Sequence, residues 1–383
     1  MATTTDFSTI PYDWYIDPAV ARLEQERIFR RTWQYAAHTG ELAEAGSFVA
    51  TRAGNVPAVI VRGRDKELRA FVNVCRHRGY LLCDGAGKRE TLQCPYHAWT
   101  YDLDGTLSGV PDSASYPGLD KARHGLAPVD LEIWRGFVFV RLAGDGPGVA
   151  EMMAPYAALL EPYRFEELRA LGRVTLRPRA VNWKIIGDNY SDGLHIAVAH
   201  PGLNRLFGKS YGVEATEHVD RMWGELQDRP SANWSERAYQ RLLPPIPHLP
   251  PERQRSWQYL KLWPNIAFDI YPDQIDFMQW LPISPTKSLI REIGYAIPDA
   301  DSSNLRRREM RATRYLNWRI NRQVNAEDTT LIARVQQGMT SRSFTAGPLS
   351  IKEVCLRRFC QRMRDAIPEA RFEQAPPAVW SRG

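Results

Sequence analysis

Three side chains that can bind a transition metal lie close together in the segment DNYSDGLHIAVAH, residues 188–200. Asp192, His195 and His200 provide one carboxylate and two imidazoles, a ligand set that suits iron. The two histidines are about 140° apart on an ideal helix, so both reach one ion only if the helix ends or distorts between them. Pro201 disfavours helical geometry at His200. Taken alone, the pattern is weak, and a helix end with two ordinary histidines explains it better than a metal site.

Two Cys–His pairs lie upstream, Cys75 with His77 and Cys94 with His97. Two cysteines and two histidines also form a common zinc site. In zinc fingers, however, the cysteines form one pair and the histidines the other, whereas each pair here contains one of each. Mixed pairs suit a binuclear cluster in which two thiolates bind one iron and two imidazoles bind the other, the Rieske [2Fe–2S] arrangement.

The two motifs, C-x-H-R-G from Cys75 and C-P-Y-H-x-W-x-Y-x-x-x-G from Cys94, resemble those of the Rieske family. Respiratory members of that family carry a further cysteine three residues after the first histidine, where this chain has Tyr80. The resemblance therefore points to the branch that contains oxygenases and ferredoxins. A Rieske cluster carries one electron at a time and performs no chemistry on carbon, so an electron acceptor is expected elsewhere in the chain.

The DNYSDGLHIAVAH segment resembles the D-x-x-H-x-x-x-x-H motif in the catalytic domain of Rieske non-haem iron oxygenase large subunits. In that family a further carboxylate precedes a glutamine by eight residues, which matches Asp328 and Gln336. The resemblance implies that His195, His200 and Asp328 bind one mononuclear Fe(II) and leave positions open for O₂. Glu327, the neighbouring carboxylate, is the alternative ligand.

The same resemblance assigns Asp192 to electron transfer rather than to iron binding. It implies that this carboxylate hydrogen-bonds His195 and also a Rieske histidine of a neighbouring subunit, matching His97, because a metal-bound imidazole has a free N–H to donate. The chain is accordingly expected to form a homotrimer, with an α3β3 assembly as the alternative. Asn189 and Asp188 match the polar residues that precede the relay acid, and both are expected to support the site.

The sequence around these motifs predicts the elements that position them. Helical spacing over residues 18–37 is followed from about residue 47 by short strands rich in β-branched residues, and the GDGPG segment at 144–148 indicates a linker. Residues 174–186 predict a strand that leads into DNYSDGLHIAVAH, and residues 244–252 predict a loop. Four alternating segments then predict an antiparallel sheet, followed by two helices: strands at 257–263, 265–271, 274–283 and 289–297, and helices at 302–337 and 350–366.

These elements predict an α+β chain with three parts. Residues 1–44 form a helical segment that packs on the catalytic domain. Residues 45–148 form a Rieske [2Fe–2S] β domain, and residues 149–383 form the catalytic domain with the mononuclear iron. The resemblance further implies a helix-grip fold for the last part, in which an antiparallel sheet wraps against a long helix.

The composition sets limits on the setting of these domains. The chain has 383 residues, of which 44% are hydrophobic and 25% charged, as in ordinary globular proteins. No apolar run is long enough for a membrane span and the N-terminus lacks an apolar signal sequence, so a cytoplasmic protein is expected. Arginines cluster at residues 306–322, and the net charge is +6. Such a face is usually solvated, and otherwise suits an acidic electron-transfer partner or anionic substrates; no nucleic-acid motif accompanies it.

The expected function is that of the terminal oxygenase component of a multicomponent Rieske mono- or dioxygenase. Each chain would hold one [2Fe–2S] cluster and one Fe(II), with electrons from NAD(P)H supplied by a reductase, with or without a ferredoxin. The positive charge and apolar residues such as Phe268, Phe277 and Met278 favour an aromatic, carboxylated substrate, as in aromatic hydrocarbon catabolism. The alternative is a quaternary ammonium or N-methyl compound bound among aromatic rings, for which the catalytic half offers Trp223, Trp234, Trp257, Trp263 and Trp280. A Rieske electron carrier with an inactive catalytic domain is the second alternative.

Overall fold

The computed structural model describes residues 8–298 and 303–368. The chain divides into two compact units, one of residues 24–154 and the other of residues 1–23 with residues 155–383. The first boundary lies at residue 24, whereas the sequence predicted it at residue 45. Residues 34–38, expected to continue a helix, instead form a strand of the first unit's sheet. Among the described residues, no helix is both long and apolar enough to cross a membrane.

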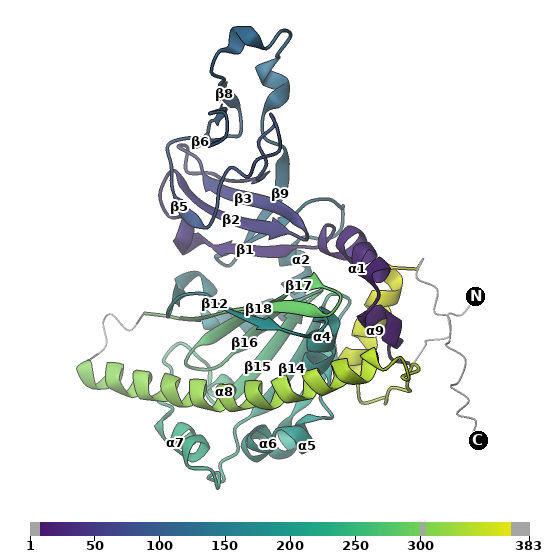
Figure 1. The fold of residues 1–383 in the computed structure, drawn as a ribbon. Helices are drawn as coiled ribbons and strands as arrows, with labels where there is room; N and C mark the ends of the chain where they lie inside the picture. The colour runs from purple at the N-terminus through teal and green to yellow at the C-terminus, as the bar shows by residue number, and fades with distance from the viewer. Residues whose placement is uncertain (1–7, 299–302, 369–383) are drawn as a thin grey trace, which may run out of the picture. The chain divides into compact units, whose positions relative to one another are not determined.

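The unit of residues 24–154 is built on a seven-stranded antiparallel sheet in the order β1-β10-β9-β4-β3-β2-β5, and it also contains a three-stranded sheet β6-β7-β8 (Figure 1). Alternate residues of a strand face opposite sides, so Val59 and Val61 pack in one apolar cluster with the motif cysteines, and Ile60 packs in another. The elements are β1 (Gln34–His38), β2 (Ser47–Ala53), β3 (Val56–Arg62), β4 (Leu68–Val72), β5 (Ala86–Lys88), β6 (Leu92–Gln93), β7 (Thr100–Tyr101), β8 (Leu107–Gly109), β9 (Pro128–Trp134), β10 (Phe137–Arg141) and α2 (Val149–Met153).

The second unit is built on an eight-stranded antiparallel sheet in the order β11-β18-β17-β16-β15-β14-β13, with β12 also paired to β18. The four strands predicted between residues 257 and 297 are confirmed as β15 to β18, each paired with the next. The sequence did not predict β13 and β14, because β14 buries the charged Asp220 and so lacks a simple apolar alternation. The strands are β11 (Arg169–Ala170), β12 (Thr175–Arg179), β13 (Gly212–Ala215), β14 (Val219–Glu225), β15 (Ser256–Leu262), β16 (Ile266–Ile270), β17 (Ile275–Ser284) and β18 (Lys287–Ala296).

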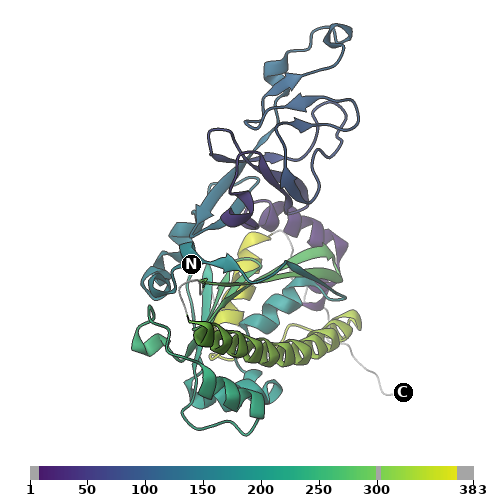
Figure 2. The ribbon, with the colours of Figure 1, turned by 90° about the vertical axis from the view of Figure 1, so that its left-hand side faces the viewer.

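The long helix α8 runs across one face of this sheet, as both views show (Figures 1 and 2). It has 37 residues, and its Leu316 and Ile320 pack in one apolar cluster with Trp257 of β15. The predicted long and short C-terminal helices are thereby found as α8 and α9, in agreement with the predicted α+β class. The helices are α1 (Pro18–Glu24), α3 (Ala157–Leu160), α4 (Trp183–Ser191), α5 (Ile196–Ala199), α6 (Pro201–Phe207), α7 (Trp234–Leu242), α8 (Asn304–Thr340) and α9 (Val354–Ala366).

Candidate metal centres and active site

Two loops with the same backbone form carry the Cys and His residues of the first unit. In each loop the cysteine N–H donates to the carbonyl five residues later, that of Tyr80 or Trp99, at 2.8 Å in both. The residue four positions after the cysteine donates back to the cysteine carbonyl from a left-handed conformation, with φ of 76° at Gly79 and 55° at Ala98. The two loops therefore present their cysteine and histidine side chains in equivalent ways.

The side chains of these loops fit a binuclear cluster. Cys75 and Cys94 are buried, and the ring centroids of His77 and His97 are 4.6 Å apart. Nδ1 of His77 is buried without a hydrogen-bond partner, which is costly unless a metal ion binds it. Burial, and then the neighbouring His97, lower the pKa of His77, which favours the neutral imidazole that metals bind.

The candidate ligands of the Rieske motif do not form a compact group of three or more donor atoms in the described residues. Within the described parts of the chain, only His195, His200 and Asp328 form a group of three or more metal-binding side chains whose donor atoms all lie within 4.8 Å of one another. One tetrahedral zinc ion would need such a group at the Rieske motif. The arrangement of the two loops therefore fits the predicted iron–sulfur cluster better than zinc.

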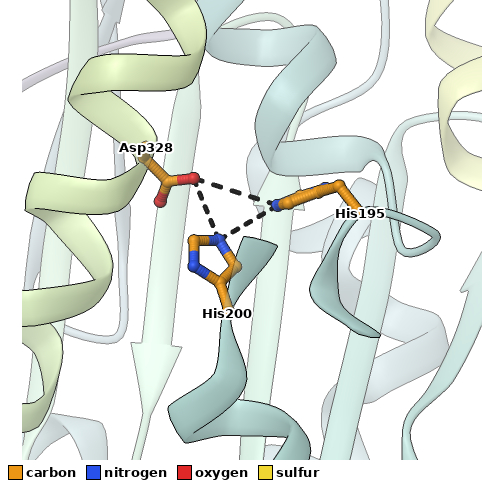
Figure 3. A group of neighbouring side chains, drawn as sticks. All are labelled: His195, His200 and Asp328. Carbon is orange, nitrogen blue, oxygen red and sulfur yellow. Dashed lines mark hydrogen bonds and ion pairs between the residues drawn. The ribbon is translucent and has the colours of Figure 1, made fainter. Parts of the chain in front are cut away.

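The second unit brings His195, His200 and Asp328 together (Figure 3). His195 precedes α5 and His200 ends it, with φ of −117° and ψ of 72°, so the helix breaks before Pro201 as predicted. The two histidine Nε2 atoms are 3.1 Å apart. Oδ1 of Asp328, which α8 contributes, lies 3.0 Å from Nε2 of His200 and 3.8 Å from Nε2 of His195. Two nitrogens and one oxygen thus converge on one point, as a facial 2-His-1-carboxylate iron site requires.

Glu327 does not converge with these three donors. Its Oε2 lies 2.8 Å from Nδ1 of His200, whereas Asp328 faces Nε2 of the same ring. Burial lowers the pKa of His200, but hydrogen bonds and charges of Asp328 and Glu327 outweigh burial and raise it. The two adjacent carboxylates therefore act on different nitrogens, and Glu327 is placed to orient the ring rather than to bind the metal.

Asp192 faces Nδ1 of His195, as Glu327 faces Nδ1 of His200. Its Oδ2 lies 3.3 Å from Nδ1 of His195, and its Oδ1 accepts a hydrogen bond from the Leu194 N–H at 2.7 Å. Burial raises the pKa of Asp192, but the hydrogen bonds with His195 and the Leu194 N–H outweigh burial and lower it. Nδ2 of Asn189 donates to Oδ1 of Asp328 at 2.7 Å. The polar residues of α4 and the turn after it therefore hold two of the three convergent side chains.

The three convergent side chains lie in the wall of a cavity of about 720 Å³. Its buried part is lined by tyrosines and carboxyl groups, namely Tyr190, Tyr211, Tyr259, Tyr271, Asp269 and Asp276. Its more exposed part is lined by Tyr315 and Trp318 of α8 and by arginines, namely Arg173, Arg177, Arg179, Arg311, Arg314 and Arg322. The cavity therefore joins the candidate iron ligands to an aromatic and acidic inner wall and a basic outer wall.

The residues expected to contact a substrate are only partly in this cavity. Phe277 and Met278 line it, but Phe268 does not. None of the five tryptophans considered for a cation is among its described lining residues. Trp257, Trp263 and Trp280 are buried in the core, whereas Trp234 is exposed. The tyrosines of the inner wall supply the aromatic faces instead.

Asp269 and Asp276 were not predicted from the sequence as residues of the site. A signal was present, because each is a carboxyl group inside an otherwise apolar strand, where burying a charge is costly. Asp188, expected near the iron ligands, is not among the lining residues and accepts a hydrogen bond from the hydroxyl of Tyr15. Burial raises the pKa of Asp188 to about 6, and the hydrogen bond from Tyr15 opposes that rise.

Two family models match this chain. Residues 32–123 match the Rieske [2Fe–2S] domain, and residues 165–369 match the catalytic domain of the ring hydroxylating alpha subunit. The two matches contain every candidate ligand of the two metal centres.

Carnitine monooxygenase oxygenase subunits are among the similar proteins. The one from Escherichia coli (strain K12) is 36% identical over 230 residues, which are 59% of this chain and 58% of the length of that relative. The one from Acinetobacter baumannii is 30% identical over 339 residues, with 88% of this chain and 86% of the relative covered. A solved quaternary ammonium Rieske monooxygenase bound to an inhibitor matches with a TM-score of 0.78 at 24% identity, over 95% of this chain and 97% of that one. This last likeness concerns the fold alone.

Proposed function

Because this chain belongs to the family of Rieske-type ring-hydroxylating oxygenase alpha subunits, we propose that it is the terminal oxygenase of a monooxygenase that acts on a quaternary ammonium or other cationic N-methyl compound. The observation that carries the proposal is the cavity, in which three convergent metal-binding side chains adjoin tyrosine rings and carboxyl groups. Aromatic faces attract quaternary ammonium ions, and carboxylates add charge attraction. The similarity to carnitine monooxygenase subunits supports the same substrate class.

The aromatic, carboxylated substrate favoured by the sequence analysis is the weaker choice. A hydrocarbon ring in the inner cavity would bury Asp269 and Asp276 further without offering either carboxyl group a positive charge, which is unfavourable. Phe277 and Met278 provide apolar surface that serves either substrate class. The arginines of the outer wall remain suited to an anionic group elsewhere on the substrate.

In the proposed site His195, His200 and Asp328 hold the iron, which supplies the activation of O₂ when it is bound. Glu327 holds the ring of His200 through Nδ1, and Asn189 holds the carboxylate of Asp328. These contacts keep the Nε2 atoms directed at the metal, since the other ring nitrogens already face carboxylates. The cavity wall orients the substrate beside these ligands.

The electron route is part of the same proposal. The Rieske loops hold the [2Fe–2S] cluster through Cys75, His77, Cys94 and His97, and Asp192 connects His195 to the cluster of a neighbouring subunit. A homotrimer, or an α3β3 assembly, would supply that neighbour. A reductase, with or without a ferredoxin, would deliver electrons from NAD(P)H, and the enzyme would operate in the cytoplasm.

Iron analysis and O₂ consumption together test the proposal. The oxygenase should contain about three irons per chain, two in the cluster and one mononuclear, whereas a Rieske electron carrier would contain about two. With a surrogate reductase, cationic N-methyl compounds such as carnitine, glycine betaine and choline should stimulate O₂ uptake and release an aldehyde. Uptake stimulated only by aromatic carboxylates would overturn the substrate assignment.

A further inference from the structure

Asp269 lies in a row of cavity-lining residues that crosses four strands of the large sheet. Tyr259 of β15 pairs with Asp269 of β16, which pairs with Asp276 of β17, which pairs with Gly294 of β18. Paired residues on neighbouring strands share a face of the sheet, and all four line the cavity. A Cβ atom at Gly294 would lie 3.0 Å from Oδ1 of Asp276, so the glycine leaves room for that carboxyl group.

Two carboxyl groups directly opposite each other destabilise a sheet when both are charged. Glu292 nearby is already paired with Arg177 at 2.9 Å. Among the described residues, neither Asp269 nor Asp276 forms an ion pair with a lysine or arginine. The described lysines and arginines therefore leave the carboxyl groups of Asp269 and Asp276 without a compensating positive charge.

A hydrogen bond ties Asp269 to the helix that supports the iron ligands. The hydroxyl of Tyr190, on α4, donates to Oδ1 of Asp269 at 2.5 Å, and the preceding residue, Asn189, donates to Asp328. Burial raises the pKa of Asp269 to about 7. The hydrogen bond from Tyr190 lowers this pKa, whereas the negative charges of Glu292 and Asp328 raise it further. A cation placed beside Asp269 would stabilise the charged carboxylate and so offset both the free-energy cost of its burial and the repulsion from Glu292 and Asp328.

Aromatic rings surround the same position. Tyr190, Tyr211, Tyr259 and Tyr271 all line the cavity, and the rings of Tyr259 and Tyr271 meet edge to face at 6.3 Å. Burial raises the pKa of all four hydroxyls, so these rings remain neutral. A neutral aromatic wall around a buried carboxyl group is a suitable surface for a bulky organic cation.

We propose that Asp269, oriented by Tyr190, binds the positively charged nitrogen of the substrate and is the residue that distinguishes a trimethylammonium group from an uncharged group of the same shape. The inference rests on the proposed function, because it assigns the charge-recognising residue of that same cavity. Asp276, opposite Asp269, adds to the negative potential of the inner wall.

The test compares two ligands that differ only in charge at one atom: glycine betaine and 3,3-dimethylbutanoate, in which carbon replaces the charged nitrogen. Calorimetric titration of the iron-loaded protein should show that the wild type prefers the cation. The preference is the dissociation constant of 3,3-dimethylbutanoate divided by that of glycine betaine. Asp269→Asn, which keeps the shape of the side chain, should reduce this ratio by about 10- to 100-fold, mainly by weakening glycine betaine binding. Tyr190→Phe, which keeps the carboxyl group, should reduce the ratio less.

Asp273→Asn is the matched control. Asp273 is also buried, lies on the same hairpin and accepts a hydrogen bond from the hydroxyl of Tyr239 at 2.8 Å, but it does not line the cavity. This variant should keep the wild-type ratio.

The inference about Asp269 is overturned if wild type shows no preference for the cation, or if Asp269→Asn keeps the wild-type ratio. An equal loss in Asp273→Asn would also overturn it. The proposed function is judged separately: if a cationic N-methyl compound drives O₂ uptake while Asp269→Asn keeps its ligand preference, only the charge-recognition assignment fails. If no such compound drives uptake, the proposed function itself fails.

Discussion

Replacement of Glu327 by alanine should weaken iron binding without removing a ligand. In the structure Glu327 faces Nδ1 of His200 at 2.8 Å, while Asp328 faces Nε2. Loss of a carboxylate that orients a metal-binding histidine typically lowers metal affinity about 10- to 100-fold. Because the side chain of His200 is only 2% exposed, water cannot readily replace the lost acceptor. We therefore expect the upper end of that range, about 100-fold, or about 2.7 kcal/mol.

The assay is titration of the loaded enzyme with a competing Fe(II) chelator, with the visible absorption of the Rieske cluster as an internal reference. Glu327→Ala should release its mononuclear iron at about a hundredfold lower chelator activity than wild type, while the cluster absorption stays constant. Asp328→Ala should retain no mononuclear iron. Glu309→Ala, at an exposed position of the same helix, is the control for helix charge. If Glu327→Ala and Glu309→Ala hold iron equally well, the assignment of Glu327 as an orienting residue is wrong.

Three further predictions concern other parts of the chain. Asp192→Asn should keep both metal centres but abolish turnover, because it removes the carboxylate beside His195; turnover at the wild-type rate would refute the relay. Burial raises the pKa of Asp273 to about 6, so the folded state favours the protonated form and stability is lost as pH rises from about 4 to about 6. Asp273→Asn should therefore be more stable than wild type at pH 8 by up to about 3 kcal/mol in urea unfolding, and similar to it at pH 4; an unchanged pH dependence would contradict this. Ala98→Val should lower cluster content, because a β-branched residue is strained at the left-handed φ of 55°, and full cluster absorption would argue against that strain.

The two candidate metal centres could be predicted from sequence because most of their chemistry is local. Cys75 and His77 lie in one tight loop, and Cys94 and His97 lie in another. Because each pair is only a few residues apart in a loop, the spacing in the sequence is enough to predict that its side chains lie close together. Pro201 likewise predicted the helix break at His200. Only Asp328 comes from a distant element, and its assignment rested on the family resemblance rather than on any physical signal in its own segment.

The strand at residues 34–38 and the different positions of Glu327 and Asp328 could not be predicted from the local sequence. Residues 34–38 have apolar spacing compatible with a helix, but pairing with β10 makes them a fully buried strand, since tertiary hydrogen bonds override a weak local preference. Glu327 and Asp328 are adjacent acids on one helix. Their different roles depend on how α8 is rotated against His200, which only packing decides.

The cavity is the clearest case of what tertiary structure decides. From sequence alone, Asp269 and Asp276 are two acids in apolar strands, and Tyr190 and Tyr259 are two unremarkable aromatics. Strand register sets Asp269 opposite Asp276 and beside Tyr259, and packing of α4 on the sheet brings Tyr190 to Asp269. The sequence determined the candidate ligands of the cluster and the two histidines of the mononuclear site, because the spacing of these residues is a local property. Which molecule lies beside them depends on side chains from separate strands and helices, and only the folded sheet and its helices bring those together.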